Sequence, residues 1–185
     1  DQVATEDASF SFVVPVNAFT DSDSGDSIAF NASLANGDAL PAWLTFNAAT
    51  RTFSGTPDNG SVGVISLKVT ATDSGGLAAS DVFELTVNDV NDAPVVANPI
   101  ADQFVPEDSI FHFTIPVDTF VDVDLGDTIS YNATQSNGST LPSWLAFNAA
   151  TRVFSGTPSN GDVGTLTIKG TATDGGGLAV SGNFN

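Results

Sequence analysis

The chain contains neither cysteine nor methionine, and it has a single histidine, His112, among its 185 residues. Without cysteine, neither a disulfide framework nor a thiolate zinc site can form. A catalytic triad and a zinc hydrolase both need histidine beside partner residues, and this lone histidine has no suitable partner set. We therefore expect a protein that is not an enzyme.

Basic residues are also scarce. Four Lys and Arg residues stand against 22 Asp and Glu residues, which gives a formal net charge of −18. Nucleic acid and anionic membranes are poor partners for such a chain, because binding them requires the opposite sign of charge. The apolar runs are far too short to cross a bilayer, so we expect no membrane insertion by this segment.

The excess of acid has two explanations. A solvated acidic surface is the simpler one. The sharper one is that many Asp residues bind metal, because carboxylate oxygens suit hard cations, calcium above all.

The most informative feature is an internal repeat. The block LPAWLTFNAATRTFSGTP begins at Leu40 and recurs as LPSWLAFNAATRVFSGTP from Leu141, so the two copies are offset by 101 residues (141 − 40). No gap is needed anywhere in the comparison. The sequence therefore predicts two copies of one domain, in residues 1–92 and 93–185.

Short apolar and β-branched runs separated by Gly, Asp and Asn turns predict strands throughout. In the first copy these runs span residues 10–14, 28–33, 43–46, 51–54, 62–72 and 77–87. The segment VISLKVTAT alternates apolar and polar residues, as a half-buried strand does, and no segment has a helical period. A copy of roughly 100 residues with this pattern fits an immunoglobulin-like β-sandwich.

The second copy ends at the counterpart of Glu84, so the counterparts of residues 85–87 are missing. We expect a truncated last strand in this copy and an exposed sheet edge. That edge is either open or filled by another chain.

Two acidic loops occur at equivalent places in the repeats. They read DSDSGD from Asp21 and DVDLGD from Asp122. Alternating Asp residues with a Gly for the turn are typical of a calcium-binding loop. The loop is not an EF-hand, because Ala32 stands at its twelfth position, where a bidentate Glu is required. A polar turn without an ion is the alternative.

The segment DVNDAP, which begins at Asp89, resembles the linker between cadherin repeats. Cadherins also carry an early Glu, an Asp-x-Asp loop and a late Ala-x-Asp segment, and each has a counterpart in both copies. The block LPxWLxFNxxTRxFSGTP is similar to the dystroglycan-type cadherin-like domain of large bacterial surface proteins. The resemblance implies an all-β chain of two tandem immunoglobulin-like, cadherin-like Greek-key sandwiches.

The resemblance also implies calcium ligands at the junction of the two copies. They are Glu6, Asp89, the carbonyl of Val90, Asn91, Asp92, the carbonyl of Ala93, Asp122, Asp124 and Asp174. Half-sites that face further repeats are implied at Asp21, Asp23, Asp73 and Glu107. The acidic Asp-Arg-Glu segment of cadherins is replaced by PDNGS, in which Asp58 is the one acid, so the number of ions stays open.

Converging carboxylates repel one another, and a bound calcium ion converts that repulsion into a clamp. The expected function is therefore a calcium-rigidified spacer and adhesion module in a large extracellular or cell-surface protein. Its expected partners are neighbouring repeats of the same polypeptide. A calcium-dependent polysaccharide-binding module, with Trp43 and Trp144 as stacking platforms, is the alternative, and association with another adhesin copy also stays open.

Overall fold

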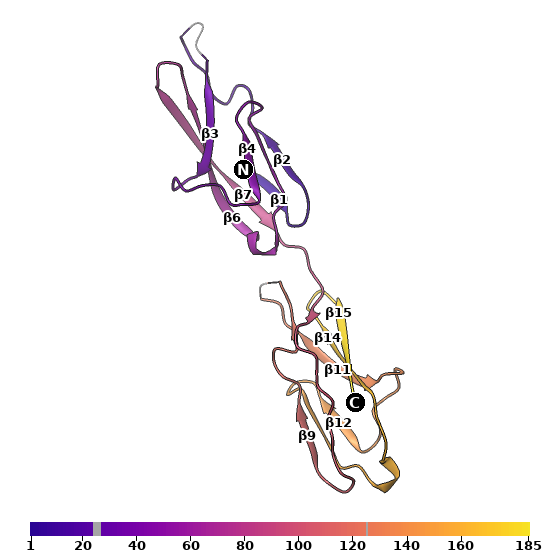
Figure 1. Cartoon of the computed structure of the whole chain (residues 1–185). Coiled ribbons are helices and arrows are strands. Elements are labelled where there is room, and N and C mark those ends of the chain that lie inside the picture. Colours follow the sequence, from indigo (N-terminus) through magenta and orange to yellow (C-terminus); the bar gives the residue numbers. More distant parts are fainter. Residues whose placement is uncertain (24–26, 125) are drawn as a thin grey trace. The chain divides into compact units, whose positions relative to one another are not determined.

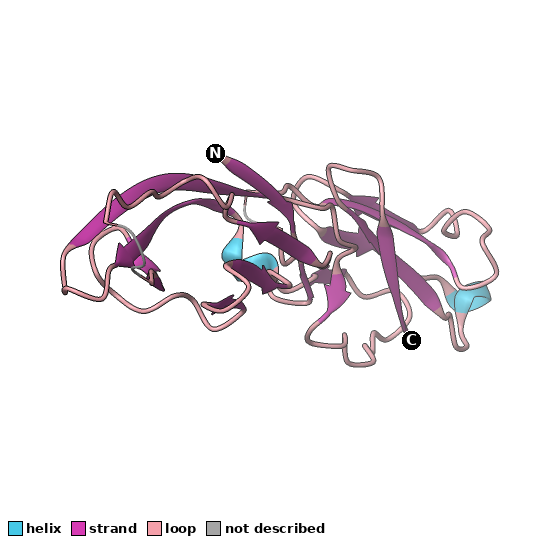
Figure 2. Ribbon diagram, turned by 90° about the horizontal axis from the view of Figure 1, so that it is seen from above, coloured by secondary structure: helices cyan, strands magenta, loops and turns pink. Residues whose placement is uncertain are grey.

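The computed structural model describes the whole chain except residues 24–26 and 125. It consists of two compact units, Asp1–Val90 and Asn91–Asn185 (Figure 1). The domain boundary predicted from the sequence lies slightly later, between Asp92 and Ala93. Strands make up the regular structure of both units, and the helices among the described residues are two single turns, η1 (Asn59–Ser61) and η2 (Asn160–Asp162) (Figure 2). The predicted all-β class is confirmed.

The first unit is a sandwich of two sheets. One sheet has the order β1 (Gln2–Thr5), β7 (Ala78–Asn88), β6 (Gly63–Thr72) and β3 (Ala29–Leu34). The other has the order β2 (Phe10–Val13), β5 (Thr52–Gly55) and β4 (Leu44–Asn47). Each predicted strand is present with its ends shifted by a residue or so. Strand β1 was not predicted, and it pairs in parallel with the end of β7, whereas the other strand pairs among the described residues of this unit are antiparallel.

The second unit repeats this plan, but its last two strands are shorter than their counterparts β6 and β7. One sheet has the order β11 (Ser130–Gln135), β14 (Ile168–Thr173) and β15 (Ala179–Phe184). The other has the order β12 (Leu145–Asn148), β13 (Val153–Gly156) and β9 (Phe111–Thr114), and β8 (Val95–Val96) pairs with β10 (Phe120–Val121). Strand β15 has 6 residues where β7 has 11.

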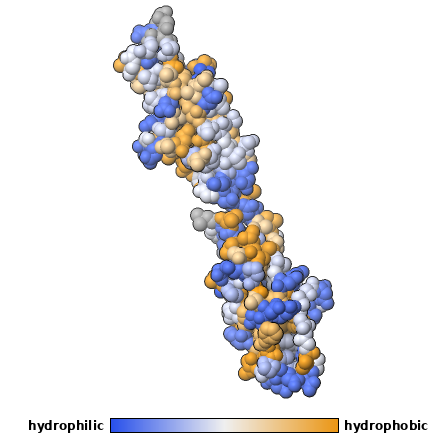
Figure 3. Space-filling view, viewed as in Figure 1, coloured by the Kyte–Doolittle hydropathy of each residue, from blue (hydrophilic) through white to orange (hydrophobic). Residues whose placement is uncertain are grey.

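Hydrophilic and hydrophobic residues are mixed on the face of each unit that Figure 3 shows. None of the helices among the described residues has the length and apolar character needed to cross a membrane.

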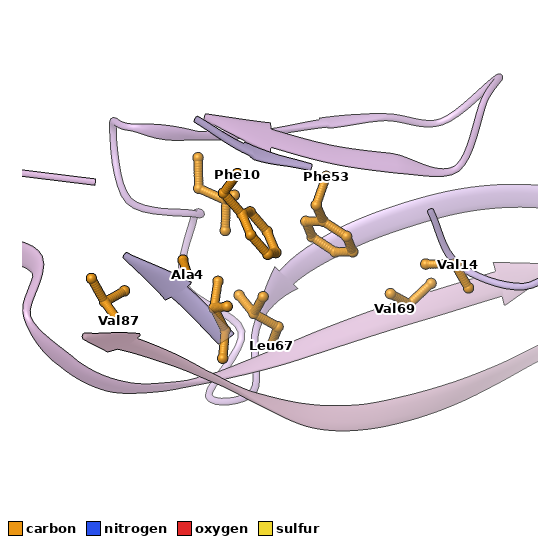
Figure 4. Close-up of a cluster of buried hydrophobic side chains, with 9 residues drawn as sticks. Ala4, Phe10, Val14, Phe53, Leu67, Val69 and Val87 are labelled. Atoms are coloured by element: carbon orange, nitrogen blue, oxygen red, sulfur yellow. The ribbon is translucent and has the colours of Figure 1, made fainter. Parts of the chain in front are cut away.

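The core of the first unit forms between its two sheets (Figure 4). Phe53 has no exposed surface, and its ring lies 4.6 Å from that of Phe46 and 5.7 Å from that of Phe83, measured between ring centroids. The alternation of VISLKVTAT is confirmed, because Leu67, Val69 and Ala71 are buried while Lys68 and Thr70 between them are half-buried. Each buried Leu, Val or Phe side chain stabilises the fold by about 1.5–3 kcal/mol.

The repeated segment FSGTP requires its glycine. A Cβ atom at Gly156 would lie 1.9 Å from the carbonyl oxygen of Trp144, and Gly55 stands in the same relation to Trp43. The two strands that meet here can therefore approach only without a side chain at this position. The contact fixes the backbone of each Trp, whose half-buried side chain packs against the core of its unit.

The substitution Gly156→Ala is expected to destabilise the second unit by about 3 kcal/mol or more, because backbone atoms must move apart to admit the methyl group. Gly161→Ala is the matched control, since a Cβ there meets only the Ser159 hydroxyl at 3.8 Å. It should change the free energy of unfolding by no more than about 0.5 kcal/mol. Urea denaturation followed by Trp fluorescence measures both, and equal stability of the two variants would contradict the assignment.

Candidate metal centre

Three segments of the second unit bring a group of its acidic residues together. The loop after β10 holds Asp122, Asp124 and Asp127, and the hairpin between β14 and β15 begins with Asp174. The third segment is the start of the unit, where Asn91 and Asp92 lie. Ladder pairing of β11 with β14 brings the first two segments together although they are far apart in the sequence.

Carboxylate oxygens of Asp122, Asp127 and Asp174 all lie within 4.8 Å of one another. Calcium binds oxygen at about 2.3–2.6 Å, so two ligands on opposite sides of one ion are at most about 5 Å apart. The three carboxylates therefore lie within the reach of a single ion. Each like-charged pair at such a distance repels by about 1 kcal/mol in water, and by more where water is excluded.

Backbone hydrogen bonds hold these carboxylates in place. The N–H of Asp124 donates to Asp122 Oδ1 at 3.1 Å, and the N–H of Gly175 donates to Asp127 Oδ2 at 3.2 Å. The N–H of Leu178 donates to Asp174 Oδ1 at 2.8 Å. The second oxygen of Asp122, Oδ2, is buried and accepts no hydrogen bond from the described part of the chain. A cation would compensate the burial of this oxygen.

The first residues of the second unit form hydrogen bonds with acidic side chains of both loops. Asn91 Nδ2 donates to Asp174 Oδ2 at 3.0 Å, and the N–H of Asp92 donates to Asp124 Oδ2 at 2.7 Å. Asp124 is buried, with 8% of its surface exposed. Gly176 makes room for Asn91, since a Cβ at that position would lie 2.0 Å from Asn91 Oδ1.

Asp174 is held in its charged form. Its burial raises the pKa through desolvation, but hydrogen bonds from the Asn91 side chain and from the backbone N–H groups of residues 176–178 outweigh that effect. The pKa therefore lies below its ordinary value. A carboxylate that stays ionised under mildly acidic conditions is the protonation state that a metal ligand needs.

In the first unit, Glu6 is almost completely buried, with 1% of its surface exposed. Its Oε1 accepts a hydrogen bond of 2.6 Å from the N–H of Val90, and its own N–H donates to the carbonyl of Asn88 at 3.0 Å. Glu6 thus fixes the chain where it leaves β7. Its counterpart Glu107, a predicted half-site residue, is exposed.

The other predicted half-site residues repeat the local geometry of the second unit. The N–H of Asp23 donates to Asp21 Oδ1 at 2.9 Å, and the N–H of Leu77 donates to Asp73 Oδ1 at 2.8 Å. Asp26, which matches Asp127, lies outside the described residues. Of the predicted linker ligands, Asp89, Val90 and Ala93 are exposed.

Asp127 was not among the ligands expected from the sequence. The signal was present, because it is the third Asp of DVDLGD. The ligand set followed the Asp-x-Asp pattern of the cadherin resemblance, which ends before this residue. Its proximity to Asp174 depends on the fold, through its hydrogen bond with Gly175.

The substitution Asn91→Ala is expected to raise the pKa of Asp174, because it removes a hydrogen bond to the charged form. A carboxyl whose pKa is lowered in the folded state stabilises the fold at pH values above its unfolded pKa of about 3.9. This stabilisation is lost as the pH falls through the folded-state pKa. The variant should therefore lose that contribution at a higher pH. Carboxyl 13C NMR titration without calcium measures the change, Asn98→Ala serves as the control, and an unmoved pKa would contradict the role of Asn91.

Comparison with proteins of known structure shows cadherin-like folds. Drosophila N-cadherin EC1-4 is 18% identical, with a TM-score of 0.62 over 99% of this chain and 46% of that one. The human Desmocollin-1 ectodomain is 20% identical, with a TM-score of 0.56 over 98% of this chain and 37% of that one. At these identities the likeness shows the fold alone.

Sequence comparison adds a relative and a family. The serine-rich adhesin for platelets of Staphylococcus aureus (strain USA300) is 30% identical over 145 residues, which are 78% of this chain but 6% of that protein. The chain thus spans a small part of this relative. Residues 1–88 and 93–185 each match one immunoglobulin-type domain family. The chain therefore belongs to the family described as "Putative Ig domain", with one copy of the domain in each unit.

Proposed function

We propose that the chain is a calcium-stiffened spacer and adhesion module of a larger extracellular or cell-surface protein, and that it is not an enzyme. The observation that carries this proposal is the convergence of Asp122, Asp127 and Asp174 within 4.8 Å. In a chain with a net charge of −18, such a cluster is costly unless a cation binds there.

The chemistry of the ligands favours calcium over other metals. All the candidate side chains offer oxygen, which excludes the nitrogen and sulfur ligands that zinc prefers. Calcium takes 6–8 oxygens in flexible geometry and accepts backbone carbonyls among them. The buried Asp122 Oδ2 and the ionised Asp174 carboxylate are suited to bind a calcium ion directly.

The segment that joins the units is the element on which calcium acts. Asn91 and Asp92 are hydrogen-bonded to Asp174 and Asp124, and Glu6 is hydrogen-bonded to Val90, the residue that precedes Asn91. In the proposed bound state, Glu6, Asn91, Asp92 and Asp124 join the ligand set. Asp89 and the carbonyls of Val90 and Ala93 complete it. Calcium then orders the connecting segment and restricts motion of one unit relative to the other.

The comparisons support this assignment at a coarser level. The fold is shared with cadherin ectodomains, and the relative from Staphylococcus aureus is named an adhesin for platelets. We infer from these an extracellular or cell-surface location, with neighbouring repeats as the first partners. The LPxWLxFNxxTRxFSGTP block, which resembles that of dystroglycan-type cadherin-like domains, supports the proposal that the chain is related to them.

The alternative of a polysaccharide-binding module rests on Trp43 and Trp144. Both side chains are half-buried and pack against the core of their unit, and the Trp144 ring makes an edge contact with Phe111. A stacking platform for sugar rings needs an exposed indole face. The packing therefore favours a structural role for both residues and the spacer function for the chain.

Calcium titration by calorimetry tests the ion site. Asp122→Asn and Asp174→Asn are each expected to weaken calcium binding by about tenfold or more, since each removes a charged ligand. Asp81→Asn is the matched control, because it makes the same charge change on the exposed face of β7. Added calcium should raise the melting temperature of the unmodified chain. Equal affinities in all four proteins would refute the site.

Small-angle scattering tests the mechanical part of the proposal separately. Because calcium is proposed to restrict motion of one unit relative to the other, its addition is expected to narrow the distribution of interatomic distances measured for the unmodified chain. In Glu6→Gln, calcium should still bind the Asp122 cluster but produce a smaller change in scattering. Glu84→Gln, an exposed position on β7, is the control. Identical scattering changes in the three proteins would show that Glu6 takes no part.

A further inference from the structure

The side chain of Arg152 connects the two sheets of the second unit. Arg152 lies in the turn between β12 and β13, and its carbonyl accepts a hydrogen bond of 3.0 Å from the N–H of Ile115. Its guanidinium carbon lies 5.7 Å from the centre of the Tyr131 ring, which belongs to β11 in the opposite sheet. A guanidinium at this distance is attracted to the face of an aromatic ring. The contact therefore ties a turn of one sheet to a strand of the other.

The Tyr131 ring in turn adjoins both segments that carry the candidate ligands. It makes an edge contact with Phe120, with 6.2 Å between the ring centroids. Phe120 is buried in β10, two residues before Asp122. In the ladder between β11 and β14, Tyr131 pairs with Ala172, two residues before Asp174. The ring is thus placed where both acidic segments begin.

Two features of Arg152 are unfavourable for folding by themselves. Its backbone φ is +59°, in the left-handed region that a residue with a Cβ atom rarely adopts. Its Nε–H is buried and has no hydrogen-bond acceptor within residues 1–23, 27–124 and 126–185. A glycine would relax the backbone, and an apolar side chain would leave no donor unpaired. Packing of the core by itself therefore does not call for arginine at this position.

The first unit contains the same arrangement. The guanidinium carbon of Arg51, whose φ is +54°, lies 5.7 Å from the centre of the Phe30 ring on β3. Phe30 makes an edge contact with Phe19 at 6.0 Å between centroids, and Phe19 lies two residues before Asp21. Two of the four basic residues of the chain therefore occupy this one place, once in each unit, and each connects to the ring that precedes an acidic loop.

We propose that Arg152 is a positioning residue for the proposed calcium site. Through the rings of Tyr131 and Phe120 it fixes the end of β10 beside the start of β11, and so the direction in which the Asp122 loop leaves the sandwich. A guanidinium has no acceptor atom, so Arg152 is not itself a ligand. The inference rests on the proposed function for its ion, and it adds a residue that acts on the ion only through other side chains.

The charge of Arg152 could act on the site in the opposite direction. A positive charge near the acids weakens the binding of a cation, so removal of the charge alone would strengthen calcium binding. Loss of positioning instead weakens calcium binding, because the carboxylates then have to be ordered when the ion binds. The sign of the change in affinity therefore separates the two effects.

Calcium calorimetry on Arg152→Met tests the proposal at a temperature where circular dichroism shows every variant folded. Methionine fills similar apolar space but carries neither the charge nor the buried donor. We expect the affinity to fall by about fivefold, less than for a residue that touches a ligand directly. Arg51→Met, which removes the same contact from the first unit, is the matched control and should keep the affinity within about twofold. Unchanged or tighter binding in Arg152→Met would overturn the positioning role.

Further variants decide the question even if Arg152→Met does not fold. Tyr131→Leu breaks the connection at the ring and should weaken calcium binding by a similar factor. Arg152→Lys, which keeps a positive charge over the ring, should retain most of the affinity. The double variant should bind no more weakly than the weaker single variant, because both changes act through one contact. Additive losses would show that Arg152 does not act through Tyr131.

Nitrogen-15 relaxation NMR in chelator separates this inference from the calcium proposal. Without any ion, Arg152→Met should lower the backbone order parameters of Asp122 and Asp124, and Arg51→Met should leave them unchanged. If the unmodified chain binds no calcium, the proposed function fails, but the order parameters still decide whether Arg152 positions the loop. Order parameters that are equal in all three proteins would overturn the positioning role.

Discussion

Mutual repulsion of carboxylates that the fold holds within reach of one ion is the constraint on which the candidate site depends. Asp122 and Asp174 come from separate loops, and the pairing of β11 with β14 leaves them little freedom to separate. Backbone N–H groups orient them and keep Asp174 ionised. These hydrogen bonds restrict the side-chain freedom of both loops, which lowers the ordering entropy that binding of an ion would cost. A flexible acidic loop would have to lose that entropy on binding.

The two units use the same loops in different surroundings. Asp73 and Asp174 make the same bond to the residue four positions later, but the amide of Asn91 is bonded to Asp174. Glu6 and Glu107 differ as well, since Glu6 is buried against the chain that leaves β7 and Glu107 is exposed. Equivalent acidic loops therefore have unequal surroundings, because residues outside each loop also contact its acids.

The sequence made the fold predictable where the signal was local. Alternation along VISLKVTAT and the turn residues located the long strands, and the repeat located the second copy. Strand β1 escaped prediction because its four residues carry little alternation and its partner, β7, lies at the other end of the unit. Asp127 escaped because only the fold brings it beside Asp174. The placement of the Arg51 guanidinium over the Phe30 ring, at 5.7 Å, likewise depends on a contact that the fold makes, between the turn before β5 and strand β3.

The parallel pairing of β1 with β7 also affects how the first unit responds to force. Its first and last strands run in the same direction, so the chain enters at one end of the sheet and leaves at the other. Tension applied through the two ends pulls these neighbouring strands along each other, in shear, and loads their hydrogen bonds together. Bonds loaded together resist more than bonds that open one at a time. A unit that is loaded through its two ends gains its resistance from this pairing of its first and last strands.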